Sequence, residues 1–63
     1  MIKNNLYNLM MQMTVEHLSL WRIKKHYLRD AKTREEKKFW ADLAKQKEVA
    51  LVNLKKLIKK DLN

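Results

Sequence analysis

The chain has 63 residues, a net charge of +8, and no cysteine, glycine or proline. Sixty-three residues allow one domain, and a core of that size is marginally stable without disulfides, a metal or a partner chain. Lack of cysteine excludes disulfides, thiolate metal sites and a cysteine nucleophile, so self-association is the expected further source of stability. We see no secretory signal and expect a cytoplasmic protein.

The first predicted helix runs from about residue 5 to about residue 30. Projected at 100° per residue, one broad apolar side consists of Ile2, Leu6, Leu9, Met10, Met13, Leu20, Trp21, Tyr27 and Leu28. A second apolar set, on the opposite side, consists of Tyr7, Met11, Val15 and Leu18. A helix that is apolar nearly all round needs cover on more than one side, so we expect the second set to contact a partner or another copy. The longest uncharged stretch, 4–15, is too short and too polar to span a bilayer.

The centre of the chain carries the clearest signal for a helix start. Thr33 is followed three residues later by Glu36, which is the pattern of a capping box. Both lie in a polar run, 29–38, that interrupts the apolar periodicity. We therefore predict a turn at about 31–33. Without glycine, Asp30 or Lys32 is expected to adopt a strained positive φ there.

The second predicted helix runs from about residue 34 to about residue 61 and has one apolar stripe. The stripe consists of Phe39, Trp40, Leu43, Ala44, Ala50, Leu51, Leu54, Leu57, Ile58 and Leu62. The opposite face carries Lys38, Lys45, Lys56, Lys59 and Lys60. One continuous helix is disfavoured, because its two stripes would be about 140° out of phase. We predict an all-α fold with a single domain, 1–63: a two-helix antiparallel hairpin that oligomerises, most simply as a dimeric four-helix bundle.

Polar residues interrupt both stripes at mid-helix. In a hairpin that turns near residue 32, facing positions sum to about 64. Glu16 then faces Lys47 and Glu48, and His17 lies beside them. We predict a polar core layer of Glu16, His17, Lys47 and Glu48. Such a layer fixes the register and number of helices at some cost in stability.

The stretch from Val15 to Lys60 resembles the helical hairpin of the ferritin-like and rubrerythrin-like families. Those families place a Glu in a first helix and Glu-x-x-His in the second. Glu16 and Glu48 match two of these positions, but Leu51 stands where the family has its histidine. The resemblance implies a helical bundle. Because leucine cannot bind a metal, we expect no metal and no other cofactor; a degenerate metal-binding bundle is the alternative.

The basic residues near the turn suggest an anionic partner. The candidates are Arg22, Lys25, Arg29, Lys32, Arg34, Lys37 and Lys38. Arg22, Lys25 and Arg29 fall within about 60° on a regular helix, a spacing suited to a phosphate backbone. We find no nucleophile–base–acid set and no glycine-rich phosphate loop, and predict a non-enzymatic protein without catalytic residues.

We therefore expect a homo-oligomer that binds nucleic acid, either non-specifically or in a regulatory role. An acidic protein is the other anionic partner considered. One alternative function is a structural or adaptor protein that docks through Tyr7, Met11, Val15 and Leu18. Another is a cationic protein that acts at membrane surfaces. The remaining reading is a basic face that only keeps the chain in solution.

Overall fold

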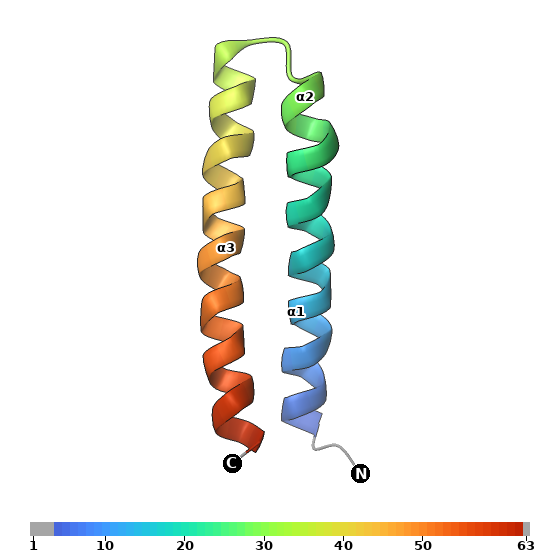
Figure 1. Ribbon diagram of the computed structural model, residues 1–63, viewed down its shortest axis with the longest axis vertical. Helices are drawn as coiled ribbons and strands as arrows, with labels where there is room; N and C mark the ends of the chain where they lie inside the picture. Colours follow the sequence, from blue (N-terminus) through green and yellow to red (C-terminus); the bar gives the residue numbers. More distant parts are fainter. Residues whose placement is uncertain (1–3, 63) are drawn as a thin grey trace.

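The computed structural model describes residues 4–62, which form two antiparallel helical arms side by side (Figure 1). The first arm consists of α1 (Asn4–Arg22), a π-helical turn η1 (Ile23–Tyr27) and a short α2 (Leu28–Asp30). The second arm is α3 (Arg34–Leu62). Without glycine or proline, no residue interrupts either arm with the usual helix-breaking chemistry. The predicted all-α helical hairpin is confirmed.

The capping box at the start of α3 is also confirmed. Thr33 Oγ1 accepts a hydrogen bond from the Glu36 backbone N–H at 3.0 Å, and the Glu36 carboxylate accepts one from the Thr33 N–H at 3.1 Å. The same carboxylate oxygen also accepts a hydrogen bond from the Lys32 N–H, at 2.8 Å. These backbone donors lower the pKa of Glu36 from its ordinary value of 4.5. One carboxylate therefore holds both the turn and the helix start.

The predicted positive φ in the turn is wrong. Ala31 leaves the helix with φ −63° and ψ 133°, an extended conformation open to any residue. Its N–H still bonds to the Tyr27 carbonyl at 3.0 Å. Within residues 4–62, no residue has a positive φ. The chain reverses through an extended residue instead. Glu36 accepts hydrogen bonds from the backbone N–H groups of Lys32 and Thr33 in this turn.

Replacing Thr33 with alanine is expected to lower the free energy of unfolding by about 1 kcal/mol, because an N-cap acceptor is lost. The Glu36 pKa adds a pH dependence. A pKa lowered by folding gives stability that is present above the unfolded value of 4.5 and is lost as the pH falls through the folded value. Glu36→Gln should therefore lose less stability than wild type between pH 5 and pH 2, measured by urea denaturation.

The matched control for this capping experiment is Glu35→Gln, which removes a neighbouring charge in the same helical turn. No hydrogen bond to the Glu35 side chain is present in the described part of the chain. If the free energy of unfolding falls as steeply between pH 5 and pH 2 in Glu36→Gln as in Glu35→Gln, the cap does not cause the pH dependence of stability.

The π-helical turn was not predicted. The Leu28 N–H bonds to the carbonyl of Ile23, five residues back, and closes a wider turn than an α-helix does. The wider turn changes the rotational phase of every residue after it. Ile23, which the projection left out of the apolar side, is the most deeply buried side chain at 1% exposure. Tyr27 packs on Trp40 across the hairpin, with ring centroids 4.8 Å apart.

The contact between the two arms, which we call the seam, is narrow. The buried apolar side chains among the described residues are Leu6, Ile23, Ala44 and Leu51. Half-buried side chains flank them: Leu9, Met13, Leu20, Trp40, Leu43, Leu54 and Ile58. Several members of the predicted stripes are instead exposed, namely Met10, Trp21, Tyr27, Phe39, Leu57 and Leu62. One neighbouring helix covers only part of a broad apolar stripe, so the flanks of both stripes remain open.

Candidate nucleic-acid interface

Most of the basic side chains in residues 4–62 have no acidic partner. Four of those in residues 4–62 form ion pairs: Lys24 with Glu48, Arg29 with Asp30, Lys38 with Asp42, and Lys47 with Glu16. The others have no carboxylate of the described residues within 4.0 Å: Arg22, Lys25, Lys32, Arg34, Lys37, Lys45, Lys55, Lys56, Lys59 and Lys60. Their positive charge is not neutralised within the described hairpin and is open to an anionic ligand.

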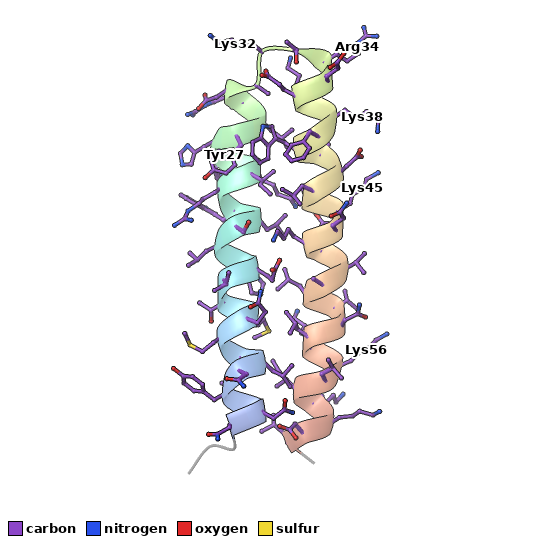
Figure 2. The ribbon with its side chains drawn as sticks, turned by 180° about the vertical axis from the view of Figure 1, so that it is seen from behind. Tyr27, Lys32, Arg34, Lys38, Lys45 and Lys56 are labelled. Atoms are coloured by element: carbon purple, nitrogen blue, oxygen red, sulfur yellow. The ribbon has the colours of Figure 1, made fainter. Side chains whose placement is uncertain are left out.

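The cations on α3 are arranged along its outer side. Figure 2 shows Arg34, Lys38, Lys45 and Lys56 along the edge of α3 that faces away from the first arm. Arg34, Lys45 and Lys56 are each eleven residues apart in sequence, which is close to three full α-helical turns. They therefore share one side of the helix, at intervals of about 16 Å. We call these four residues the outer stripe; from Arg34 to Lys56 it is about 33 Å long.

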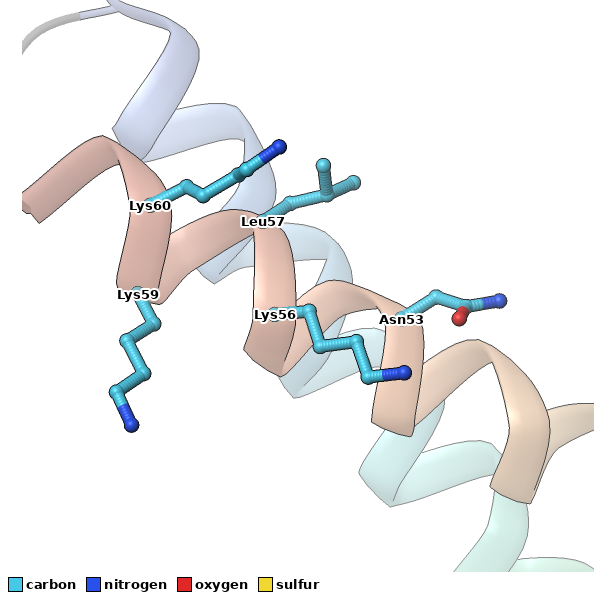
Figure 3. Close-up of a pocket in the computed structure, with 5 residues that line it drawn as sticks. All are labelled: Asn53, Lys56, Leu57, Lys59 and Lys60. Carbon is cyan, nitrogen blue, oxygen red and sulfur yellow. The ribbon is translucent and has the colours of Figure 1, made fainter.

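A lysine cluster lies at the C-terminal end of α3 and was missing from the predicted site. Lys56, Lys59 and Lys60 line an open hollow with Asn53 and Leu57 (Figure 3). Lys56 and Asn53 extend to the same side of the helix, whereas Lys59 points away from them. The signal was present in the sequence, because four lysines fall within the six residues 55–60. Only Lys56 of this cluster belongs to the outer stripe, since Lys60 also lines a hollow with Asn5 and Leu9 of α1.

The predicted tip residues are exposed, but they are not equivalent. Arg29 Nε lies 3.4 Å from Asp30, and Lys38 Nζ lies 2.8 Å from Asp42. The hydrogen bond from Lys38 lowers the pKa of Asp42 and raises that of Lys38. The other five, Arg22, Lys25, Lys32, Arg34 and Lys37, have no carboxylate of residues 4–62 within that reach.

The predicted common face of Arg22, Lys25 and Arg29 assumed a regular α-helix. The π-turn from Ile23 to Tyr27 lies between the first and last of these residues, so the assumed 100° step does not hold across it. Their shared face is therefore not established. The side chains on α3 are the better basis for an interface, because that helix is regular from end to end.

The centre of the seam contains a buried ion pair. Lys47 Nζ lies 3.1 Å from Glu16 Oε2 and donates a hydrogen bond to Oε1 at 3.3 Å. Gln12 donates a second bond to Oε1 at 2.9 Å, while Oε2 has the ammonium group of Lys47 as its contact. The side chains of Glu16 and Lys47 are only 10% and 24% exposed. The antiparallel register thus pairs these two residues as expected.

Two other members of the predicted polar layer lie elsewhere. Glu48 pairs with Lys24 at 3.0 Å, with both side chains about half exposed, while Lys47 pairs with Glu16. His17 is exposed and lines an open hollow with Leu18, Leu20, Trp21 and Lys24, so its inclusion in the layer was wrong. A residue next to a seam residue is rotated by 100° and leaves the seam. Among residues 4–62, no three His, Asp or Glu side chains cluster as metal ligands would.

The predicted partner residues on α1 form an exposed, uncharged face. Tyr7, Met11, Val15 and Leu18 are joined there by Met10 and Trp21, which the projection had assigned to the other side. We call these six the α1 outer face; their exposures lie between 42% and 53%. The only Asp, Glu, Lys or Arg between Asn4 and Trp21 is Glu16, which is buried in the seam. This face is therefore mainly apolar, and His17 and Lys24 border it beside Leu18 and Trp21.

None of the described helices combines the length and the apolar content that crossing a bilayer requires. Comparison of the chain with protein-family models, with curated proteins and with solved structures found no match.

Proposed function

We propose that this chain is a non-enzymatic, self-associating protein that binds nucleic acid along the outer side of α3. The observation that carries the proposal is the row of exposed cations on a regular helix, with Arg34, Lys45 and Lys56 unpaired and regularly spaced. Long lysine side chains reach phosphates without demanding one exact geometry, so the contacts position a backbone and carry no base sequence. Binding is accordingly non-specific or weakly selective.

The length of the outer stripe suits a nucleic-acid backbone. Its ~33 Å from Arg34 to Lys56 is close to the 34–36 Å of one helical turn of B-DNA. Duplex DNA carries one negative charge per about 1.7 Å of its axis, a far denser array than the acidic surface of a typical protein. The net charge of +8 on a chain this small adds long-range attraction to any such polyanion.

Fluorescence anisotropy with duplex DNA, single-stranded DNA and RNA across a salt series tests the proposal. The three unpaired cations of the outer stripe, as three phosphate contacts, give a slope of about −2.7 in log K against log salt for duplex DNA. The affinity should then fall roughly 40-fold between 50 and 200 mM salt. Failure to bind any of the three nucleic acids at 50 mM salt would refute the proposed function.

Lys45→Gln and Lys56→Gln are each expected to reduce the salt slope by about 1, because each removes one phosphate contact. The matched control is Lys24→Gln, which makes the same charge change at a lysine already paired with Glu48. The control should change the slope less. Equal effects of all three variants would mean that net charge, and not the outer stripe, determines binding.

The α1 outer face supports a second candidate, in which the chain docks onto a partner protein. Flexible methionine side chains such as Met10 and Met11 adapt to varied surfaces, and large exposed apolar patches mark interaction sites. Solution mass separates the candidates. A monomer at micromolar concentration would favour a partner protein, whereas a dimer would favour the proposed self-association into a four-helix assembly.

A further inference from the structure

We propose that two copies pack through the α1 outer face, so that the dimer carries an outer stripe on each of two opposite sides and bridges two nucleic-acid segments. The interface stands on its own observations, whereas the bridging rests on the proposed function.

The α1 outer face and the outer stripe point in opposite directions. On α1, the outer-face residue Leu18 is about 160° from the seam residue Glu16 on helix geometry. On α3, the outer stripe points away from the first arm (Figure 2). Because the two arms lie side by side, the α1 outer face and the outer stripe are on opposite sides of the hairpin (Figure 1). A copy that covers the first surface leaves the second one open.

Charge identifies the occupant of the α1 outer face as a second copy. Two copies of a chain with a net charge of +8 repel each other wherever their lysines meet. Between Asn4 and Trp21, α1 exposes no Asp, Glu, Lys or Arg side chain, whereas the outer side of α3 carries unpaired lysines. Contact through α1 keeps the like charges at the outside of the dimer. An acidic partner would instead be attracted to α3.

The exposed area matches the requirement of a dimer. The chain has 5428 Å² of accessible surface, whereas a compact monomer of 7.7 kDa has about 4,300 Å². The excess of about 1,100 Å² is larger than the ~800 Å² that each partner buries in a standard interface. With aromatic side chains of roughly 150–250 Å² each, the six half-exposed residues present on the order of 500 Å². Two copies reach about 1,000 Å², the lower bound for a specific interface.

The resulting order of helices is α3, α1, α1 of the second copy, α3 of the second copy. Packed helices lie 8–10 Å apart, so the two outer α3 axes are separated by roughly 27 Å and their stripes face opposite directions. Duplex DNA has a persistence length of about 150 base pairs. A short, stiff duplex that follows one stripe therefore does not reach the other. Filling both stripes takes two segments, which the dimer holds together.

Solution mass tests the interface with two variants of equal charge. Met11→Lys combined with Leu18→Lys places two charges in the α1 outer face. The control, Val49→Lys combined with Val52→Lys, places two charges on exposed positions of α3. By analytical ultracentrifugation, wild type and control should have twice the 7.7 kDa chain mass, and the α1 variant should have the single-chain mass. Far-UV circular dichroism checks that each remains helical.

A monomeric wild type, or an α1 variant that remains helical and dimeric, would overturn the interface. A control variant that also dissociates would overturn it too, because added charge alone would then explain the loss. Chain mass does not depend on nucleic-acid binding, so these outcomes are independent of the proposed function.

Capture of one duplex by another tests the bridging. Beads bearing a 30-base-pair duplex are mixed with a second, fluorescent duplex and with protein at 50 mM salt. Wild type and control should retain the fluorescent duplex, and the α1 variant should retain at least about tenfold less. In anisotropy, the same variant should still bind a single duplex.

Equal capture by the α1 variant, or a dimeric wild type that binds one duplex without capturing a second, would overturn the bridging alone. Absence of any nucleic-acid binding by wild type would refute the bridging together with the proposed function. In that case the mass measurement alone would still decide the interface.

Discussion

Lys47→Met is expected to lower the free energy of unfolding by about 3 kcal/mol, because it leaves a buried carboxylate without its cation. The remaining partner, Glu16, has only the hydrogen bond from Gln12, and its Oε2 already accepts none. Glu16→Met, which removes the other member of the pair, should lower the free energy of unfolding by a smaller amount. Lys47 is 24% exposed, and its long side chain extends its ammonium group to water more readily than Glu16 does its carboxylate.

The double variant Glu16→Met with Lys47→Met should be neutral or more stable than wild type by about 1–4 kcal/mol, because no charge is then buried. Glu48→Ala is the control; it breaks an ion pair whose side chains are about half exposed and should cost less than about 1 kcal/mol. Urea denaturation at one fixed chain concentration measures all four. A loss for Lys47→Met no larger than that for Glu48→Ala would show that the pair does not determine stability.

Ile23→Ala is expected to lower the free energy of unfolding by about 2–5 kcal/mol. Ile23 has the smallest exposure of the described residues and fills the seam from within the π-turn. Truncation leaves a cavity and removes a β-branched residue in favour of the strongest α-helix former. We expect the π-turn to relax toward a regular α-turn, which would rotate Tyr27 away from Trp40.

Near-UV circular dichroism detects the loss of the tilted contact between Tyr27 and Trp40, and urea denaturation detects the loss of stability. The control is Val52→Ala, which truncates another β-branched residue at an exposed position and should change stability by no more than about 0.5 kcal/mol. If both truncations cost the same, the seam at Ile23 would not be tightly packed.

Local chemistry made the hairpin predictable. Thr33 and Glu36 have the identity and spacing of a capping box, and their side chains bond only to nearby backbone groups. Once that turn is placed, antiparallel geometry alone brings Glu16 opposite Lys47. Both inferences need the sequence spacing and nothing about packing. For that reason they agree with the structure to within a residue.

The π-turn could not be predicted in the same way. A projection at 100° per residue has no means of detecting a wider turn, so it misplaced the faces that follow Ile23. Ile23 itself lies seven residues after Glu16, close to two full α-helical turns, so the regular projection already places it on the seam side and its omission has no cause in the π-turn. His17 failed for a related reason, since a residue one step from the seam was counted as part of it. The turn conformation failed because Ala31 reverses the chain in an extended form that most residues adopt.

The candidate interface was predictable in composition and only partly in position. The lysines of α3 follow directly from the helical spacing of Lys38, Lys45 and Lys56. Which cations are neutralised depends on side-chain conformations, as in the pairs of Lys24 with Glu48 and Arg29 with Asp30. A charge count along the sequence does not contain that information.

The lengthwise separation of charge in the first arm determines how two such arms can lie together. Among the described residues of this arm, 4–30, the exposed Lys and Arg side chains begin at Arg22, and residues 4–21 expose no Asp, Glu, Lys or Arg. In a parallel pair, the cationic ends of both arms would meet side by side. In an antiparallel pair, they lie at opposite ends of a molecule 47 Å long, several times the ~8 Å over which physiological salt screens charge. Electrostatic repulsion therefore favours an antiparallel arrangement of the two first arms in the proposed dimer, with a twofold axis across the middle of α1.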